Sequence, residues 1–351
     1  MYTDKDIDSA IDQGVLSEQD AAAFRAHVSQ LRKTQTQDNE QFSLIGGFHD
    51  VFIAIACVLV LVSIGYLGVV LTGIVFPRAM VGLFIGGGLS TMLASWGLAE
   101  FFTRKRQKAL PSIILVLGFV IGTIFSAGAI VELVNGDGGI EDFNGADFGF
   151  DGVVVIGVTV IALFAHWRRF KVPITVAALT FAIIGFFGIL VGFTIRPIPL
   201  NIFLFLGGLA TLGVALRWDI SDLERQTRRS DVAFWLHLLA APLLVHPIFV
   251  SLNVFEPDTS VISAAVIILA YGVMSVISLS LDRRALMVSG LGYALYAFYV
   301  ILESIGFTGV SFSIAGLVIG SGLLLMSAFW EYCRRGLVRH YPVFLQKLLP
   351  K

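Results

Sequence analysis

The sequence predicts an all-α fold, a polytopic bundle of about ten transmembrane helices preceded by a small cytoplasmic helical hairpin. Hydrophobic residues make up 56% of the 351 residues and charged residues only 14%, and the mean hydropathy is +0.86. A soluble domain has a more even balance of apolar and charged residues. Lysine and arginine are also confined to alternate connections between apolar stretches, a pattern typical of multi-pass membrane proteins.

Ten apolar stretches are long enough to cross a hydrocarbon core of about 30 Å, which takes about 20 helical residues. They cover approximately residues 51–74, 79–102, 110–134, 151–167, 172–195, 199–217, 232–253, 261–281, 285–304 and 311–331. An even number of spans places both termini on the same side of the membrane. The ten-span domain therefore extends over residues 51–331.

The basic residues give this bundle an orientation. Of the 24 lysines and arginines, all but Arg78 and Arg196 lie at the termini or in every second connection. Cytoplasmic loops keep basic residues because these resist translocation across the bilayer. We therefore expect the N-terminus and the C-terminus to lie in the cytoplasm.

Residues 1–33 are expected to form a separate helical hairpin, joined to the membrane domain by a tether and membrane entry at 34–50. Gly14 can end a first helix in the left-handed conformation, and Ser17 with Asp20 resembles a capping box that opens a second. The second helix carries an apolar stripe of Ala21, Phe24, Val28 and Leu31. Such a hairpin has too little apolar surface to be stable alone. It should pack on the membrane domain, on a second copy in a homo-oligomer, or on a cytoplasmic protein partner.

A family resemblance is visible in the same region. The stretch DIDSAIDQGVLSEQDAAAFRAHV and, after the polar tether, FHDVFIAIACVLVLVSIGYLG resemble the start of the uncharacterised bacterial membrane proteins grouped as domain of unknown function 2157. The resemblance covers about the first 70 residues and, beyond them, the many-span layout. It implies a protein of the bacterial inner membrane with a cytoplasmic N-terminal hairpin. It implies no activity and no catalytic residue.

Motifs for common enzyme chemistry are absent from the sequence. The chain has no P-loop, no G-x-S-x-G, no H-E-x-x-H and no C-x-x-C. No nucleophile and base pair can be identified, so we do not expect an enzyme, and neither a metal nor another cofactor is indicated. The segregation of charge between the two sides reflects membrane orientation and implies no nucleic-acid partner.

The seventh predicted span holds the strongest candidate residues. Its sequence contains His237, Pro242, His246 and Pro247, and the prolines remove helix hydrogen bonds, which predicts a broken helix at membrane depth. His246 should lie somewhat beyond the midplane and His237 nearer the cytoplasm. About 13 Å along the helix axis separates the two rings, too far to share a metal. Each histidine is a candidate proton or substrate contact; alternatively, each bonds a neighbouring carbonyl and the prolines shape packing.

Other polar candidates lie in the ninth and third spans. Tyr296, Tyr299 and Glu303 follow one stripe of the ninth span together with Tyr293, and Glu132 lies near the outer end of the third. Ionisable groups in hydrocarbon are candidates for function unless they lie near the interface. The tyrosines can also be interfacial anchors, and the carboxylates can be interfacial or paired.

Glycine pairs four residues apart predict close helix packing, because they place two positions without side chains on one helix face. The pairs are Gly82 and Gly86, Gly118 and Gly122, Gly188 and Gly192, and Gly316 and Gly320. We interpret them as contacts inside one bundle, with a homodimer face left open.

The C-terminal segment 332–351 mixes basic residues with Tyr341, Phe344 and several leucines. A basic amphipathic segment of this kind lies along a membrane surface. We expect it to contact anionic lipid of the inner leaflet.

Two functions agree with these patterns. The first is a secondary transporter or a carrier of lipid or small molecules, because ten spans with a proline-interrupted helix fit sites built at discontinuous helices. The second is a membrane scaffold or sensor that does not transport and recruits a partner through its hairpin. A cavity beside the histidines would favour the first function.

The orientation makes a direct prediction. In a cysteine-free background, single cysteines at Gly138 and Asp258 should react with an impermeant thiol reagent applied to intact cells, because both positions lie in loops with few bases. A cysteine at Gln107 should stay unlabelled. Labelling of the Gln107 position alone would reverse the orientation.

Overall fold

The computed structural model describes residues 4–25, 48–75, 80–135, 149–194, 199–222, 227–252 and 260–346. These residues are helical apart from turns and short connections, and none of them lies in a strand. The chain divides into two compact units, one of Met1–Gln41 with Gln226–Arg228 and one of the remaining residues. The all-α prediction is confirmed.

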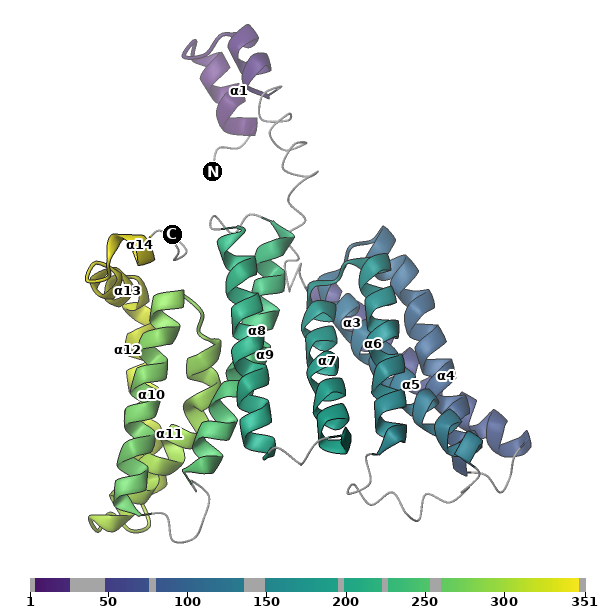
Figure 1. Ribbon diagram of the computed structural model, residues 1–351. Helices are drawn as coiled ribbons and strands as arrows, with labels where there is room; N and C mark the ends of the chain where they lie inside the picture. The colour runs from purple at the N-terminus through teal and green to yellow at the C-terminus, as the bar shows by residue number, and fades with distance from the viewer. Residues whose placement is uncertain are drawn as a thin grey trace. The chain divides into compact units, whose positions relative to one another are not determined.

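The larger unit contains ten long helices that match the ten predicted spans (Figure 1). They are α3 Phe48–Val75, α4 Met80–Ala99, α5 Ala109–Asn135, α6 Phe150–Phe170, α7 Pro173–Thr194, α8 Leu200–Ile220, α9 Arg228–Ser251, α10 Val261–Leu281, α11 Ala285–Ser304 and α12 Ser311–Ala328. Among the described residues, nine are long and apolar enough to cross a membrane, and α4 covers the second predicted span. The chain is therefore a multi-pass integral membrane protein.

Local sequence explains where several helices begin and end. Ser260 caps α10, since its Oγ accepts a hydrogen bond from the Ser263 backbone N–H at 3.1 Å. Lys171 adopts the left-handed conformation after α6, and Pro173 begins α7, a first position that proline favours. We call the side where α4, α6, α8 and α10 end and α5, α7, α9 and α11 begin the basic end (Figure 1).

Glycines allow α3, α4 and α5 to pack with their backbones in contact. A Cβ built at Gly86 would lie 2.3 Å from the carbonyl oxygen of Gly68, and one at Gly122 would lie 2.6 Å from the α4 backbone. Only glycine fits at such crossings. By contrast, a Cβ at Gly316 or Gly320 of α12 would meet no described atom within 4 Å. The interpretation as a contact inside the bundle is therefore wrong for this last pair and for Gly192, which also meets no described atom, whereas a Cβ at Gly188 would lie 2.6 Å from the Phe203 ring. The surroundings of Gly82 lie outside the described residues.

Helix α9 lies at the centre of the packing and is not broken. It runs without interruption through Pro242 and Pro247, and 61% of its apolar window is buried, more than in any other candidate span. The predicted helix break is wrong. The reason is tertiary packing: Ala241, Val245 and Phe249 are fully buried in a core shared with α8, α10 and α11. These contacts hold the helix together although each proline removes one hydrogen bond.

The segment after α12 packs against the turn between α10 and α11. It forms α13 Trp330–Val338 and α14 Val343–Gln346. The buried Trp330 donates from Nε1 to Asp282 at 2.7 Å, and the Tyr341 hydroxyl lies 2.7 Å from that of Ser280. Side chains such as Tyr332, which is 75% exposed, remain on the outer surface of the segment. Contact of this surface with anionic lipid stays a prediction.

The N-terminal unit begins with α1 Asp4–Asp12. Gly14 follows with φ of +69°, and the Ser17 Oγ accepts from the Asp20 backbone N–H at 3.1 Å, as the capping box predicts. The second helix begins at Glu18 and continues to Arg25, the last residue described before Phe48. Of its apolar stripe, Ala21 is buried and Phe24 is 48% exposed, whereas Val28 and Leu31 lie outside the described residues.

Candidate functional site

A cluster of three ionisable side chains is buried at the basic end of the bundle. Asp219 comes from the last turn of α8, His237 from α9 and Arg283 from the turn before α11. Their exposed fractions are 4%, 3% and 8%. His237 Nε2 donates to Asp219 Oδ2 at 2.7 Å, and Arg283 donates from Nη2 to Oδ1 and from Nε to Oδ2 at 3.4 Å. A buried carboxylate needs such partners because burial without them is costly.

The turn that carries Arg283 is held by its own hydrogen bonds. Asp282 adopts the left-handed conformation with φ of 53°, and the Ser278 Oγ donates to the Arg283 carbonyl at 2.5 Å. Trp330 holds the Asp282 carboxylate, and the Arg284 guanidinium lies 4.9 Å from the centroid of the Trp330 ring. The neighbouring arginines are therefore directed to different places, Arg284 onto Trp330 and Arg283 to Asp219.

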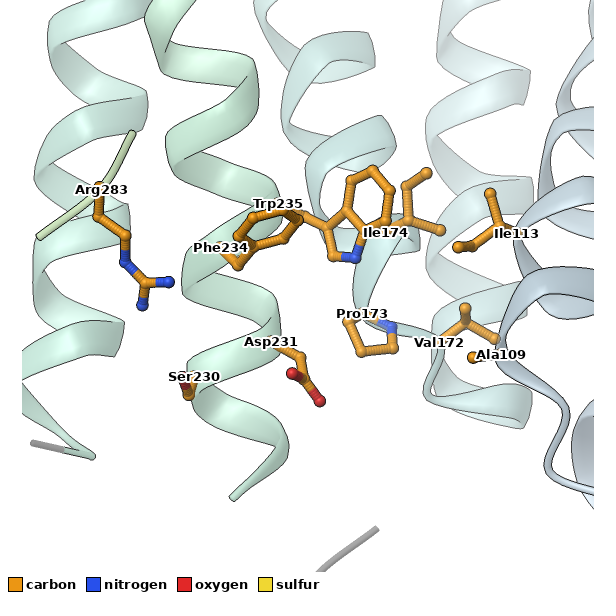
Figure 2. A pocket seen from close by; sticks show the side chains of 10 residues that line it. All are labelled: Ala109, Ile113, Val172, Pro173, Ile174, Ser230, Asp231, Phe234, Trp235 and Arg283. Atoms are coloured by element: carbon orange, nitrogen blue, oxygen red, sulfur yellow. The ribbon is translucent and has the colours of Figure 1, made fainter. Parts of the chain in front are cut away.

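A cavity of about 210 Å³ lies beside this cluster (Figure 2). Figure 2 shows Arg283 on one wall, the Phe234 and Trp235 rings of α9 in the middle, and apolar side chains of α5 and α7 on the far wall. The complete lining consists of Ala109, Ile113, Val172, Pro173, Ile174, Ser230, Asp231, Phe234, Trp235 and Arg283. The cavity thus joins an apolar surface to a few polar groups, which is the usual composition of a small-molecule site.

The two predicted histidines occupy different environments. His237 belongs to the buried cluster and bonds a carboxylate, not a backbone carbonyl. His246 is exposed, and its Nδ1 shares a hydrogen bond with the Tyr293 hydroxyl, whose ring stacks on Phe249 at a centroid distance of 4.6 Å. His246 is not among the residues that line the cavity. The cavity is lined by Arg283, which bonds the same carboxylate as His237, and neither histidine is among its lining residues.

The other predicted candidates are not part of this cluster. Tyr296 and Tyr299 line a groove of about 440 Å³ with residues of α11 and α12, while Tyr293 faces α9 instead. Glu303 accepts a hydrogen bond from Ser311 Oγ at 3.0 Å, and Glu132 is half-buried near the end of α5. The tyrosine stripe is therefore divided between two surfaces.

Sequence reasoning missed three buried polar residues. Asp219 and Arg283 lie in the basic connections after the predicted spans 199–217 and 261–281, and Asp219 is one of three acids between Arg217 and Arg225, so the sequence did not single it out. His166 of α6 is 1% exposed among the rings of Trp96, Phe119 and Phe170, with Nδ1 3.5 Å from Thr175 Oγ1. Its position just before a basic pair gave no indication of this aromatic surrounding.

The cluster at Asp219 places an imidazole in hydrogen-bond contact with a carboxylate, an arrangement that can hold and pass on a proton. Arg283 can in addition bind an anionic group from the cavity. Among the described residues, no three histidine, cysteine or acidic side chains lie together as a metal site requires.

Comparison of the chain with protein-family models, curated proteins and solved structures found no match. The resemblance to domain of unknown function 2157 is thus neither supported nor contradicted. The function proposed below is therefore inferred from the residues of the site itself.

The two histidines should differ in their effect on stability. His237→Ala removes a buried hydrogen-bond partner of Asp219 and should lower the free energy of unfolding by about 2 kcal/mol. His246→Ala changes an exposed side chain and should cost less than about 1 kcal/mol. Unfolding of both variants in the same detergent measures this difference. Equal losses, or a larger loss for His246→Ala, would contradict the assignment of His237 to the structural cluster.

Proposed function

We propose that the protein is a secondary carrier for a small molecule, with the cavity at the basic end as its substrate entrance. The observation that supports this most is the placement of the cavity beside Asp219, His237 and Arg283. Ionisable groups inside membrane spans are costly and commonly mark substrate or proton pathways. A protein that only anchored a partner would need neither the cavity nor the buried charges.

The basic end faces the cytoplasm in this proposal, in the membrane of a bacterium. The arginines and lysines that surround it support this orientation through the positive-inside rule. The substrate therefore enters from the cytoplasmic side. Because the sequence lacks a P-loop, an ion or substrate gradient is the energy source.

A line of exposed side chains on α9 supports a path beyond the cavity. Phe234 lines the cavity, and Leu238, Pro242 and His246 follow at intervals of four residues on the same side of the helix. All four are exposed although α9 is otherwise deeply buried. The line extends about 18 Å along the helix axis from Phe234. In the proposed path, the substrate passes along this line towards His246 and Tyr293.

The prolines of α9 support a change of conformation in the same helix. Pro242 and Pro247 lack the N–H that would bond the carbonyls four residues earlier, so α9 has fewer internal hydrogen bonds around this line. A helix with missing bonds bends more readily than a regular one. This is the property that a carrier needs where its two access states alternate.

A second candidate function rests on the N-terminal unit. Residues 1–41 form a compact unit that is distinct from the bulk of the membrane helices. Its described surface exposes Val15 by 75% and Phe24 by 48%. A scaffold or sensor would use this apolar surface to bind a second copy or a cytoplasmic protein.

Access to the α9 line distinguishes the two functions. In a background with Cys57→Ala and Cys333→Ser, Leu238→Cys should react with an impermeant thiol reagent from both sides of the membrane. Leu238 is 40% exposed on the proposed path, and a carrier opens that path to each side in turn. Labelling rates are measured in intact cells and in inverted membrane vesicles.

Leu59→Cys provides the matched control. Leu59 is 62% exposed on α3 and lies at a similar distance from the basic end, and the proposed path does not include it. It should react slowly from both sides. Labelling of Leu238→Cys from one side only would contradict the carrier and favour the scaffold.

A further inference from the structure

We propose that the cavity binds a small organic anion together with a proton, with Arg283 as the contact of the anion and the Asp219–His237 pair as the holder of the proton. This inference rests on the proposed function and names the substrate class of the same site. It is based on the position of Arg283, which both lines the cavity and bonds Asp219.

Arg283 has donors that Asp219 does not use. The guanidinium carries five N–H groups in a planar fork. Asp219 accepts from Nε and Nη2, and the N–H groups of Nη1 are not engaged by this carboxylate. Because Arg283 also forms part of the cavity wall, an anion that enters the cavity meets a cation that is already held in place by the turn at Asp282.

The coupling of the anion to a proton follows from the balance of charge around Asp219. His237 bonds Oδ2 of Asp219, while Arg283 bonds mainly Oδ1. With a neutral His237, the buried carboxylate depends on the positive charge of Arg283. When His237 takes up a proton from the cytoplasm, the imidazolium supplies that charge, and Arg283 can pair with the anion instead. Binding of the anion and of the proton therefore favour each other, since an unpaired buried charge is costly.

The other charged groups on the described parts of the helices around His237 lie on α8 and α9. On α8 the exposed Arg217 precedes Asp219 by two residues, and the first turn of α9 carries Arg228, Arg229 and Asp231. Helix α7 contains no titratable residue, and α10 contains only Tyr271. On α11 the first titratable side chain is Tyr293, more than two turns from the basic end. Asp219, which His237 bonds, and Arg283, which bonds the same carboxylate, are thus the charged groups of the buried cluster, and the other charges lie nearer the ends of α8 and α9.

The rest of the lining describes the body of the ligand. Ile113, Val172 and Ile174 form an apolar wall opposite Arg283 (Figure 2). The rings of Phe234 and Trp235 lie between the two walls, and Ser230 and Asp231 supply the remaining polar side chains of the lining. Ala109 and Pro173 are the first residues of α5 and α7, so two helix N-termini with their positive dipole ends also meet at the cavity. An aromatic or branched aliphatic carboxylate matches this combination.

The test uses benzoate as the probe, with benzylamine and benzyl alcohol as cationic and neutral analogues of similar shape. The full-length protein in detergent is heated with each compound near neutral pH. Benzoate should raise the midpoint of thermal unfolding and the two analogues should not. In weakly buffered solution, addition of benzoate to the protein should also raise the pH, because a proton is taken up with it.

Variants of the cluster separate the two roles. Arg283→Gln should weaken benzoate binding by roughly 10- to 100-fold. Asp219→Asn leaves Arg283 without its carboxylate, so it should retain benzoate binding but lose the proton uptake. The measurements of all three compounds on the unchanged protein keep the inference testable if these variants do not fold. His237→Gln should also lose the uptake. Arg284→Gln, whose side chain lies over Trp330, is the matched control and should bind like the unchanged protein.

The possible outcomes separate the anion-and-proton site from the proposed transport function. Stabilisation by benzylamine in place of benzoate, or by none of the three compounds, overturns the anion assignment. Benzoate binding without proton uptake in the unchanged protein overturns the coupling. One-sided labelling of Leu238→Cys overturns the carrier, whereas an anion site that binds benzoate with a proton would still stand.

Discussion

The pairing of Asp219 with Arg283 and His237 is the interaction on which the basic end of the bundle depends. It joins the last turn of α8, the first half of α9 and the turn between α10 and α11 inside an apolar surrounding. Removal of one partner from a buried ion pair costs about 3–5 kcal/mol, because the other charge is left without compensation. These three elements therefore have to keep their positions together, and Arg283 keeps its place on the cavity wall.

A buried ion pair is a poor means of stabilising a helix bundle, since well-packed apolar residues often stabilise as well or better. Two apolar core clusters that include α9 residues already fix this helix against its neighbours. The charges are thus better explained by the cavity that they border than by stability. Helix α9 combines dense packing with two missing hydrogen bonds and one exposed line of side chains. This combination suits a helix that is fixed against its neighbours but bends between two access states.

The sequence predicted the membrane helices because hydropathy and the positive-inside rule act on single segments. The predicted spans 261–281 and 285–304 coincide with α10 and α11. The prolines of α9 misled the prediction, because packing of residues such as Val245 overrides the local loss of hydrogen bonds. Asp219 and Arg283 could not be paired in advance: 64 residues separate them, and nothing local in a basic connection shows which side chain turns inwards.

The most direct test of this account is a double-mutant cycle between Asp219 and Arg283. The free energy of unfolding is measured in one detergent for Asp219→Asn, Arg283→Gln, the double variant and the unchanged protein. The account predicts that each single change is strongly destabilising and that the double variant loses less than the sum, with a coupling of at least about 1 kcal/mol. Additive losses would show that the two side chains do not pair within the membrane, and the proposed site would lose its basis.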